Sequence, residues 1–156
     1  MGMIEAVKTC LSNYANFNGR ARRSELWWFT LAYFLVDFAI GLIFSGLGIV
    51  VAMIGGMIDS DGLAGFGGII SFLGTGLSII LGLALFIPSL AVCIRRLHDI
   101  GKSGWFYLMG LIPCVGGFIL LYFFIQDSEP GPNMYGPNPK GIGGGYGGGP
   151  APGNWQ

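Results

Sequence analysis

The sequence predicts an all-α integral membrane protein with about three transmembrane helices. Hydrophobic residues fill 53% of its 156 positions and charged residues only 10%, which is too few to keep a globule of this size in solution. No Lys or Arg occurs between Arg23 and Arg95, the interval that holds the longest apolar runs. Basic clusters on either side of such runs are typical of a chain that crosses a bilayer and returns.

The N-terminal residues 3–14 predict a short amphipathic helix. Ile4, Val7, Leu11 and Tyr14 recur at helical spacing, with polar residues elsewhere on the wheel. The same apolar stripe would serve a helix lying in the headgroup plane or one packed on the cytoplasmic ends of the spans. The sequence leaves both alternatives open.

The first span is expected over residues 26–47, with a tilted or frayed extension to residue 58. Trp27 and Trp28 follow a cluster of arginines, as at a membrane interface. A helix over residues 26–58 would be about 50 Å long, against about 30 Å of hydrocarbon. Asp37 is the only acid in this run. The surrounding apolar residues outweigh its insertion cost of about 2.5 to 3.5 kcal/mol, and we interpret it as a packing residue rather than a proton or cation relay.

The second span is expected over residues 69–93, after an acidic loop at residues 59–62 and an irregular glycine-rich stretch at residues 65–68. Gly74, Ser78 and Gly82 are spaced as on a face for close helix packing, and Pro88 is expected to kink the last turns. Two spans place the arginines of residues 20–23 and 95–96 on one side of the membrane. The positive-inside bias makes that side cytoplasmic, so the N-terminus is expected inside the cell.

The remaining apolar run, residues 105–125, is long enough for a third span. Pro113, Gly116 and Gly117 interrupt it, so it could instead form a re-entrant hairpin; we favour a full crossing that places the tail outside. Residues 1–140 are predicted to be one multi-pass membrane domain. Residues 141–156 are predicted to be a low-complexity, disordered, glycine-rich tail.

Three short motifs resemble those of a family of small multi-pass bacterial inner-membrane proteins, the domain of unknown function 805 (DUF805). They are FNGRARRSELWW at residues 17–28, RRLHD followed by SGW within residues 95–105, and GPNMYGPNP at residues 131–139. The family usually ends the third motif with Gly-Pro-Asp-Pro, and Asn138 here stands in the place of that Asp. The resemblance implies a multi-pass protein of the bacterial inner (plasma) membrane and no particular reaction.

The same motifs supply a candidate site, because both arginine clusters are expected on one membrane face. Several guanidinium groups beside tryptophans can bind an anionic lipid phosphate. We therefore predict a non-catalytic binding or scaffold protein whose cytoplasmic Arg/Trp face contacts the bilayer and its anionic phospholipids. The candidate residues are Arg20, Arg22, Arg23, Glu25, Trp27, Trp28, Arg95, Arg96, His98, Asp99, Lys102 and Trp105.

Two alternatives stay open. A membrane enzyme could use His98 as acid or base on a lipid or phosphorylated substrate, with Asp99 or Glu25 orienting it, although neighbours on a helix point about 100° apart. A small-solute or ion transporter or channel subunit would need to form a homo-oligomer, with Asp37 as its midplane site. The three cysteines are too widely separated for a disulfide framework or a metal site, and no cofactor, metal or nucleic-acid partner is predicted.

Overall fold

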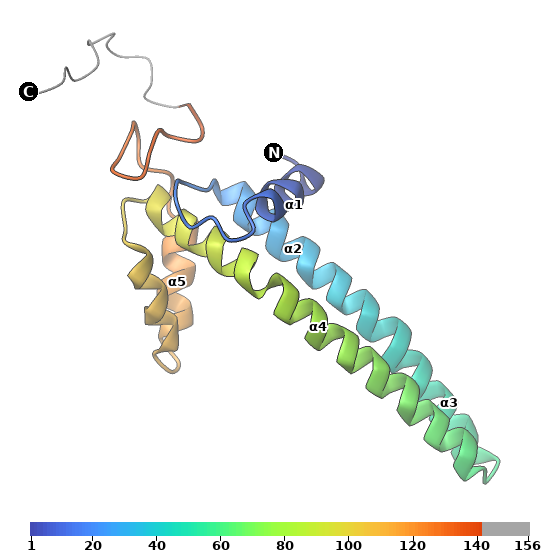
Figure 1. Cartoon of the computed structure of the whole chain (residues 1–156). Helices are drawn as coiled ribbons and strands as arrows, with labels where there is room; N and C mark the ends of the chain where they lie inside the picture. Colours follow the sequence, from blue (N-terminus) through green and yellow to red (C-terminus); the bar gives the residue numbers. More distant parts are fainter. Residues whose placement is uncertain (142–156) are drawn as a thin grey trace, which may run out of the picture.

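Two long antiparallel rods make up most of the molecule (Figure 1). The computed structural model describes residues 1–141. The first rod joins α2 (Arg23–Ile40), the π-helical segment η1 (Gly41–Gly46) and α3 (Leu47–Met57) without a break, and the second is α4 (Asp61–Asp99). Both are long and apolar enough to cross a membrane. Their lengths of about 50 and 60 Å exceed the hydrocarbon thickness of about 30 Å, so the rods must tilt or protrude.

Large apolar side chains point outward along both rods. Phe34, Met53 and Phe72 expose 60%, 63% and 77% of their surface, which suits contact with acyl chains. The buried apolar core is small and lies at one end, where Leu26 and Phe29 pack with their neighbours. We call this the basic end of the molecule. It comprises residues 1–30, 85–104 and 124–141, which include all eight Lys and Arg of the chain.

Glycines bring the two rods into contact at their other half. A Cβ on Gly67 would lie 2.4 Å from the carbonyl oxygen of Gly48, and one on Gly55 would lie 2.4 Å from the amide nitrogen of Ala64. These glycines therefore allow close helix packing and do not break the helices. The frayed extension expected before residue 58 and the irregular stretch expected at residues 65–68 are wrong, because both stretches are regular helix.

Replacing Gly67 by Ala should destabilise the rod pair by about 1 to 3 kcal/mol, because the new methyl group overlaps backbone atoms that cannot move aside. Gly68→Ala is the matched control, since a Cβ at that position meets nothing within 4 Å. Far-UV circular dichroism during SDS titration of the detergent-solubilised protein measures the difference. Equal unfolding midpoints for the two variants would contradict the contact.

The third apolar run folds into a hairpin and not into the full crossing that we favoured from the sequence. A 3₁₀ segment, η2 (Gly104–Leu111), turns back through Pro113 and Cys114 into α5 (Gly116–Ile125). The turn is tight, because a Cβ on Gly116 would lie 2.1 Å from the Met109 carbonyl oxygen. With ten residues, α5 reaches about 15 Å, roughly half of the hydrocarbon thickness.

Both ends of this hairpin lie at the basic end, beside the last turns of α4 (Figure 1). At its start, a Cβ on Gly104 would lie 2.8 Å from Ile94 Cγ2. At its finish, Arg96 donates a hydrogen bond to the Gln126 carbonyl. The chain after residue 125 therefore returns to the end that holds the N-terminus. The tail expected over residues 142–156 lies outside the described residues.

The N-terminal helix, α1 (Met3–Ser12), packs across the rods at the basic end. Ala6 and Cys10 are fully buried, and the Tyr14 hydroxyl donates to the Ala84 carbonyl of α4. The sequence left open whether this helix lies in the headgroup plane or packs on the ends of the spans. In the structure it packs on the spans. Ile4 and Leu11 of the predicted apolar stripe stay 70% and 44% exposed, because the smaller Ala6 and Cys10 make the closest contacts.

Candidate functional site

Asp99, the last residue of α4, is the centre of a buried polar network. Arg20 Nε lies 2.9 Å from Asp99 Oδ1, and Ser128 Oγ donates to Asp99 Oδ2 at 2.6 Å. Arg96 pairs with the same Oδ2. The side chains of Arg20, Arg96 and Asp99 are at most 1% exposed. Two cations around one carboxylate leave the network with an extra positive charge, which needs further acceptors in so dry a site.

The C-terminal segment, residues 126–140, supplies these acceptors from its backbone. Arg20 donates to the carbonyl oxygens of Glu129 and Gly131 at 2.7 and 2.8 Å. Arg96 donates to the carbonyl of Gln126. In the opposite direction, the Glu129 amide donates to the Asp99 carbonyl at 2.9 Å, at the end of α4. The C-terminal segment therefore covers the arginines and also satisfies the end of the long helix.

A second buried pair joins α2 to α4 beside the first. Arg95 Nη2 lies 2.7 Å from Glu25 Oε1, both side chains are 5% exposed, and the N–H bonds are not aligned for a hydrogen bond. The Cys10 thiol of α1 donates to the same Glu25 oxygen at 3.7 Å. Burial raises the pKa of Cys10 to about 12, so this thiol stays protonated at neutral pH.

Two asparagines fold the C-terminal segment against this network. Asn133 donates to the His98 carbonyl at 2.9 Å and accepts from the Tyr135 amide at 3.0 Å. Asn138 donates to the Glu129 carbonyl at 2.9 Å and accepts from the Lys140 amide at 2.8 Å. An ionised Asp could accept but not donate, so Asn at position 138 makes one hydrogen bond more than the usual family residue could.

The network joins the three sequence motifs, because Arg20 comes from the first, Asp99 from the second and Gly131 from the third. The chain matches the family described as Protein of unknown function (DUF805) over residues 14–137. The chain belongs to the DUF805 family. This DUF805 protein is similar to two proteins of Escherichia coli (strain K12). Inner membrane protein YhaH is 39% identical to it and Inner membrane protein YhaI is 37% identical. Each match covers 83% of this chain and 92% or 91% of the relative, and no solved structure matches.

The residues proposed as the site of this DUF805 protein fall into two groups. Six of them are buried in the polar core: Arg20 by its side chain, and Glu25, Arg95, Arg96, His98 and Asp99 as whole residues. The others are partly or fully exposed around it, namely Arg22, Arg23, Trp27, Trp28, Lys102 and Trp105. The guanidinium groups of the first group are buried and pair with carboxylates inside the protein, whereas the cations of the second group remain accessible.

Ser128 and the carbonyl groups of the C-terminal segment are functional parts of the network that the sequence-based set did not include. Ser128 lies between two acidic residues, and this short pattern does not predict a particular contact or site. The third motif was the available clue, because its Gly, Pro and Asn residues predict tight turns that present backbone groups. Its Gly131 and Pro139 carbonyl groups accept hydrogen bonds from Arg20 and Arg22, which lie more than 100 residues earlier in the chain.

Asp127 ties the C-terminal segment to the surface of the DUF805 protein. Arg23 Nη2 lies 2.9 Å from Asp127 Oδ2, and Lys140 pairs with Oδ1. The hydrogen bond from Lys140 is the main reason that the pKa of Asp127 falls to about 2. A carboxylate with a depressed pKa contributes stability above its unfolded pKa and loses it as the pH falls toward 2. These surface ion pairs are therefore complete at neutral pH.

His98 has neither of the acid partners that an acid–base role would use. Its ring stacks on Tyr135 with centroids 3.8 Å apart and planes 3° from parallel, and its Nδ1 lies 3.3 Å from the Gly19 carbonyl oxygen. Asp99 pairs with arginines and Glu25 pairs with Arg95. Within the described residues, no carboxylate orients the imidazole of His98.

Proposed function

We propose that this protein is a non-catalytic binding or scaffold component of the bacterial inner membrane, whose exposed cations contact anionic lipid on the cytoplasmic side. The observation that carries the proposal is the separation of charge along the molecule. The basic end holds eight cations and five carboxylates, a formal excess of three positive charges, while the opposite end carries Asp59 in the turn after α3 and Asp61 at the start of α4. Positive-inside bias then favours a cytoplasmic basic end and N-terminus.

The lipid-contacting surface is the exposed rim, which we define as Arg22, Arg23, Trp27, Trp28, Lys102 and Trp105. Among residues 1–141, the Arg22 side chain donates to the Pro139 carbonyl alone, a neutral group that does not cancel its charge. Arg23 and Lys140 share the single carboxylate of Asp127, which leaves one positive charge between them. Indole rings prefer the glycerol and carbonyl level of the bilayer, next to the phosphate groups that the cations would meet.

The triple substitution Arg22→Gln, Arg23→Gln and Lys102→Gln should reduce retention of phosphatidylglycerol and cardiolipin. Each cation near an anionic surface contributes about 1 kcal/mol at moderate salt, so the loss should exceed tenfold. Native mass spectrometry from mixed-lipid nanodiscs measures it, with phosphatidylcholine retention as the reference lipid.

The matched control keeps the charge by Arg22→Lys, Arg23→Lys and Lys102→Arg, and it should retain anionic lipid. Unchanged retention in the glutamine variant would refute the lipid-contacting rim. Arg20, Arg95 and Arg96 are unsuitable probes, because their removal would disturb the buried network.

A further inference from the structure

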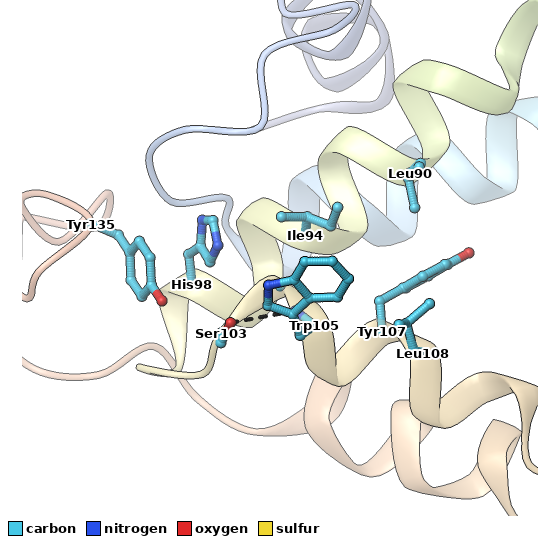
Figure 2. Close-up of a pocket in the computed structure, with 9 residues that line it drawn as sticks. Leu90, Ile94, His98, Ser103, Trp105, Tyr107, Leu108 and Tyr135 are labelled. Atoms are coloured by element: carbon cyan, nitrogen blue, oxygen red, sulfur yellow. Dashed lines mark hydrogen bonds between the residues drawn. The ribbon is translucent and has the colours of Figure 1, made fainter.

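A cleft beside His98 lies between the buried network and the exposed rim and shares Trp105 with the rim. Its volume is about 410 Å³, within the range of small-molecule sites, and it lies between the last turns of α4 and η2 (Figure 2). The side chains of Leu90, Ile94, Tyr107 and Leu108 give it mostly apolar walls. No Lys or Arg lines it.

With the basic end at the membrane interface, the cleft would extend from that interface toward the hydrocarbon. Leu90 lies eight residues before His98 on α4, which corresponds to about 12 Å along the helix. Trp105 and Leu108 of η2 are 78% and 51% exposed at its mouth, so in a bilayer the mouth faces lipid. The shape suits the hydrocarbon chain of a membrane lipid that enters through this mouth from the surrounding bilayer.

The polar atoms at the His98 end of the cleft include the His98 ring and the Ser103 hydroxyl, while the Tyr107 hydroxyl lies toward the Leu90 end (Figure 2). The Gly19 carbonyl accepts a hydrogen bond from Nδ1 of His98, so the neutral ring carries its proton there and Nε2 is an acceptor. A Cβ on Gly104, which also lines the cleft, would lie 3.4 Å from that Nε2. His98 is only 9% exposed, and no donor within residues 1–141 reaches Nε2. Ser103 Oγ accepts from the Trp105 amide and keeps its own proton to donate.

We propose that this cleft binds an uncharged lipid with a hydroxyl head, whose O–H donates to His98 Nε2 and whose oxygen accepts from Ser103 Oγ. A hydroxyl group fits because Nε2 is an acceptor that needs a donor and the nearby Ser103 hydroxyl can donate, whereas a phosphate or carboxylate head would find no cation among the lining residues. Diacylglycerol and a long-chain isoprenoid alcohol share this chemistry. The cations of the exposed rim, which would bind charged headgroups, take no part in this proposal.

The test uses the full-length protein in phosphatidylcholine nanodiscs with a diacylglycerol probe that carries a diazirine in one acyl chain. Photolabelling should be found in peptides from residues 90–108, and unlabelled diacylglycerol or isoprenoid alcohol should compete with it. The more potent competitor identifies the source of the hydroxyl. The methyl ether of diacylglycerol, which cannot donate, and phosphatidylglycerol should compete about fivefold to tenfold less well.

Gly104→Ala should reduce this labelling about fivefold to tenfold, because its methyl group covers the approach to Nε2. Gly117→Ala is the matched control, since a Cβ there meets nothing within 4 Å. His98→Asn keeps a donor for the Gly19 carbonyl but removes the Nε2 acceptor, and it should lose labelling as well. Leu108→Trp fills the cleft from an exposed position without altering the core.

Unchanged labelling in both Gly104→Ala and Leu108→Trp, or labelling spread evenly along the rods, would overturn the cleft as a binding site. Equal competition by the methyl ether would overturn the assignment of the hydroxyl head. Phosphatidylglycerol retention should be the same in Gly104→Ala and in the unaltered protein, so failure of this proposal is distinguishable from failure of the lipid-contacting rim.

Discussion

Replacing Asp99 by Asn should destabilise the folded protein by about 3 to 5 kcal/mol. Asn has the same shape but no charge, so Arg20 and Arg96 would remain buried with no carboxylate between them. The Ser128 hydroxyl would also lose its charged acceptor. The change can be measured as a lower SDS unfolding midpoint in detergent and as a lower protein level in the membrane.

Asp127→Asn is the control for that substitution. It removes the same charge from a side chain that is 63% exposed, where water replaces the lost ion pairs. Little change in the unfolding midpoint is expected. If the two substitutions had equal effects, Asp99 would not be the centre of the network.

Reporter fusions at both ends of the described chain should be on the same side of the membrane. The C-terminal segment binds Arg20 and Arg22, so it cannot lie across the bilayer from them. With a cytoplasmic basic end, green fluorescent protein should fluoresce when fused before residue 1 or after residue 141. Alkaline phosphatase, which is active only after export, should be active when fused after residue 60.

A topology in which residues 105–125 cross the membrane would give a different pattern. The fusion after residue 141 would then be dark with the fluorescent reporter and active with the phosphatase. That result would contradict the hairpin and, with it, every contact of the C-terminal segment. Since each reporter is either active or inactive, the experiment discriminates clearly between the two topologies.

The sequence was sufficient to predict the fold class and two membrane spans joined by an acidic turn, although both helices extend further than expected. Their apolar runs are continuous, and the acidic turn between them has no competing interpretation. The DUF805 assignment also follows from three local motifs, and the match over residues 14–137 confirms it. The inner-membrane names of the relatives support the expected membrane location.

The sequence was not sufficient to predict local structure where the same residue type can either break a helix or allow close helix packing. Gly48, Gly55 and Gly67 resemble helix breakers until a second backbone is found beside them. Pro113 and Gly116 are compatible with a kinked span and with a hairpin, and only the contact with Met109 decides between them. The arginines suggested a lipid site because charge density is visible in a sequence, whereas their partners are distant carboxylates and backbone carbonyls with no signature of their own.

The covering of Arg20 by Gly131 also has a consequence for biosynthesis. Arg20 leaves the ribosome 111 residues before the carbonyl that it binds, so its guanidinium stays hydrated until residue 131 has been synthesised. A nascent chain that stops before residue 126 has the cations but lacks the oxygens of the C-terminal segment. Synthesis of the C-terminal segment is therefore a condition for dehydrating this end, and chains that terminate before it would keep an unfolded terminus that proteases can recognise.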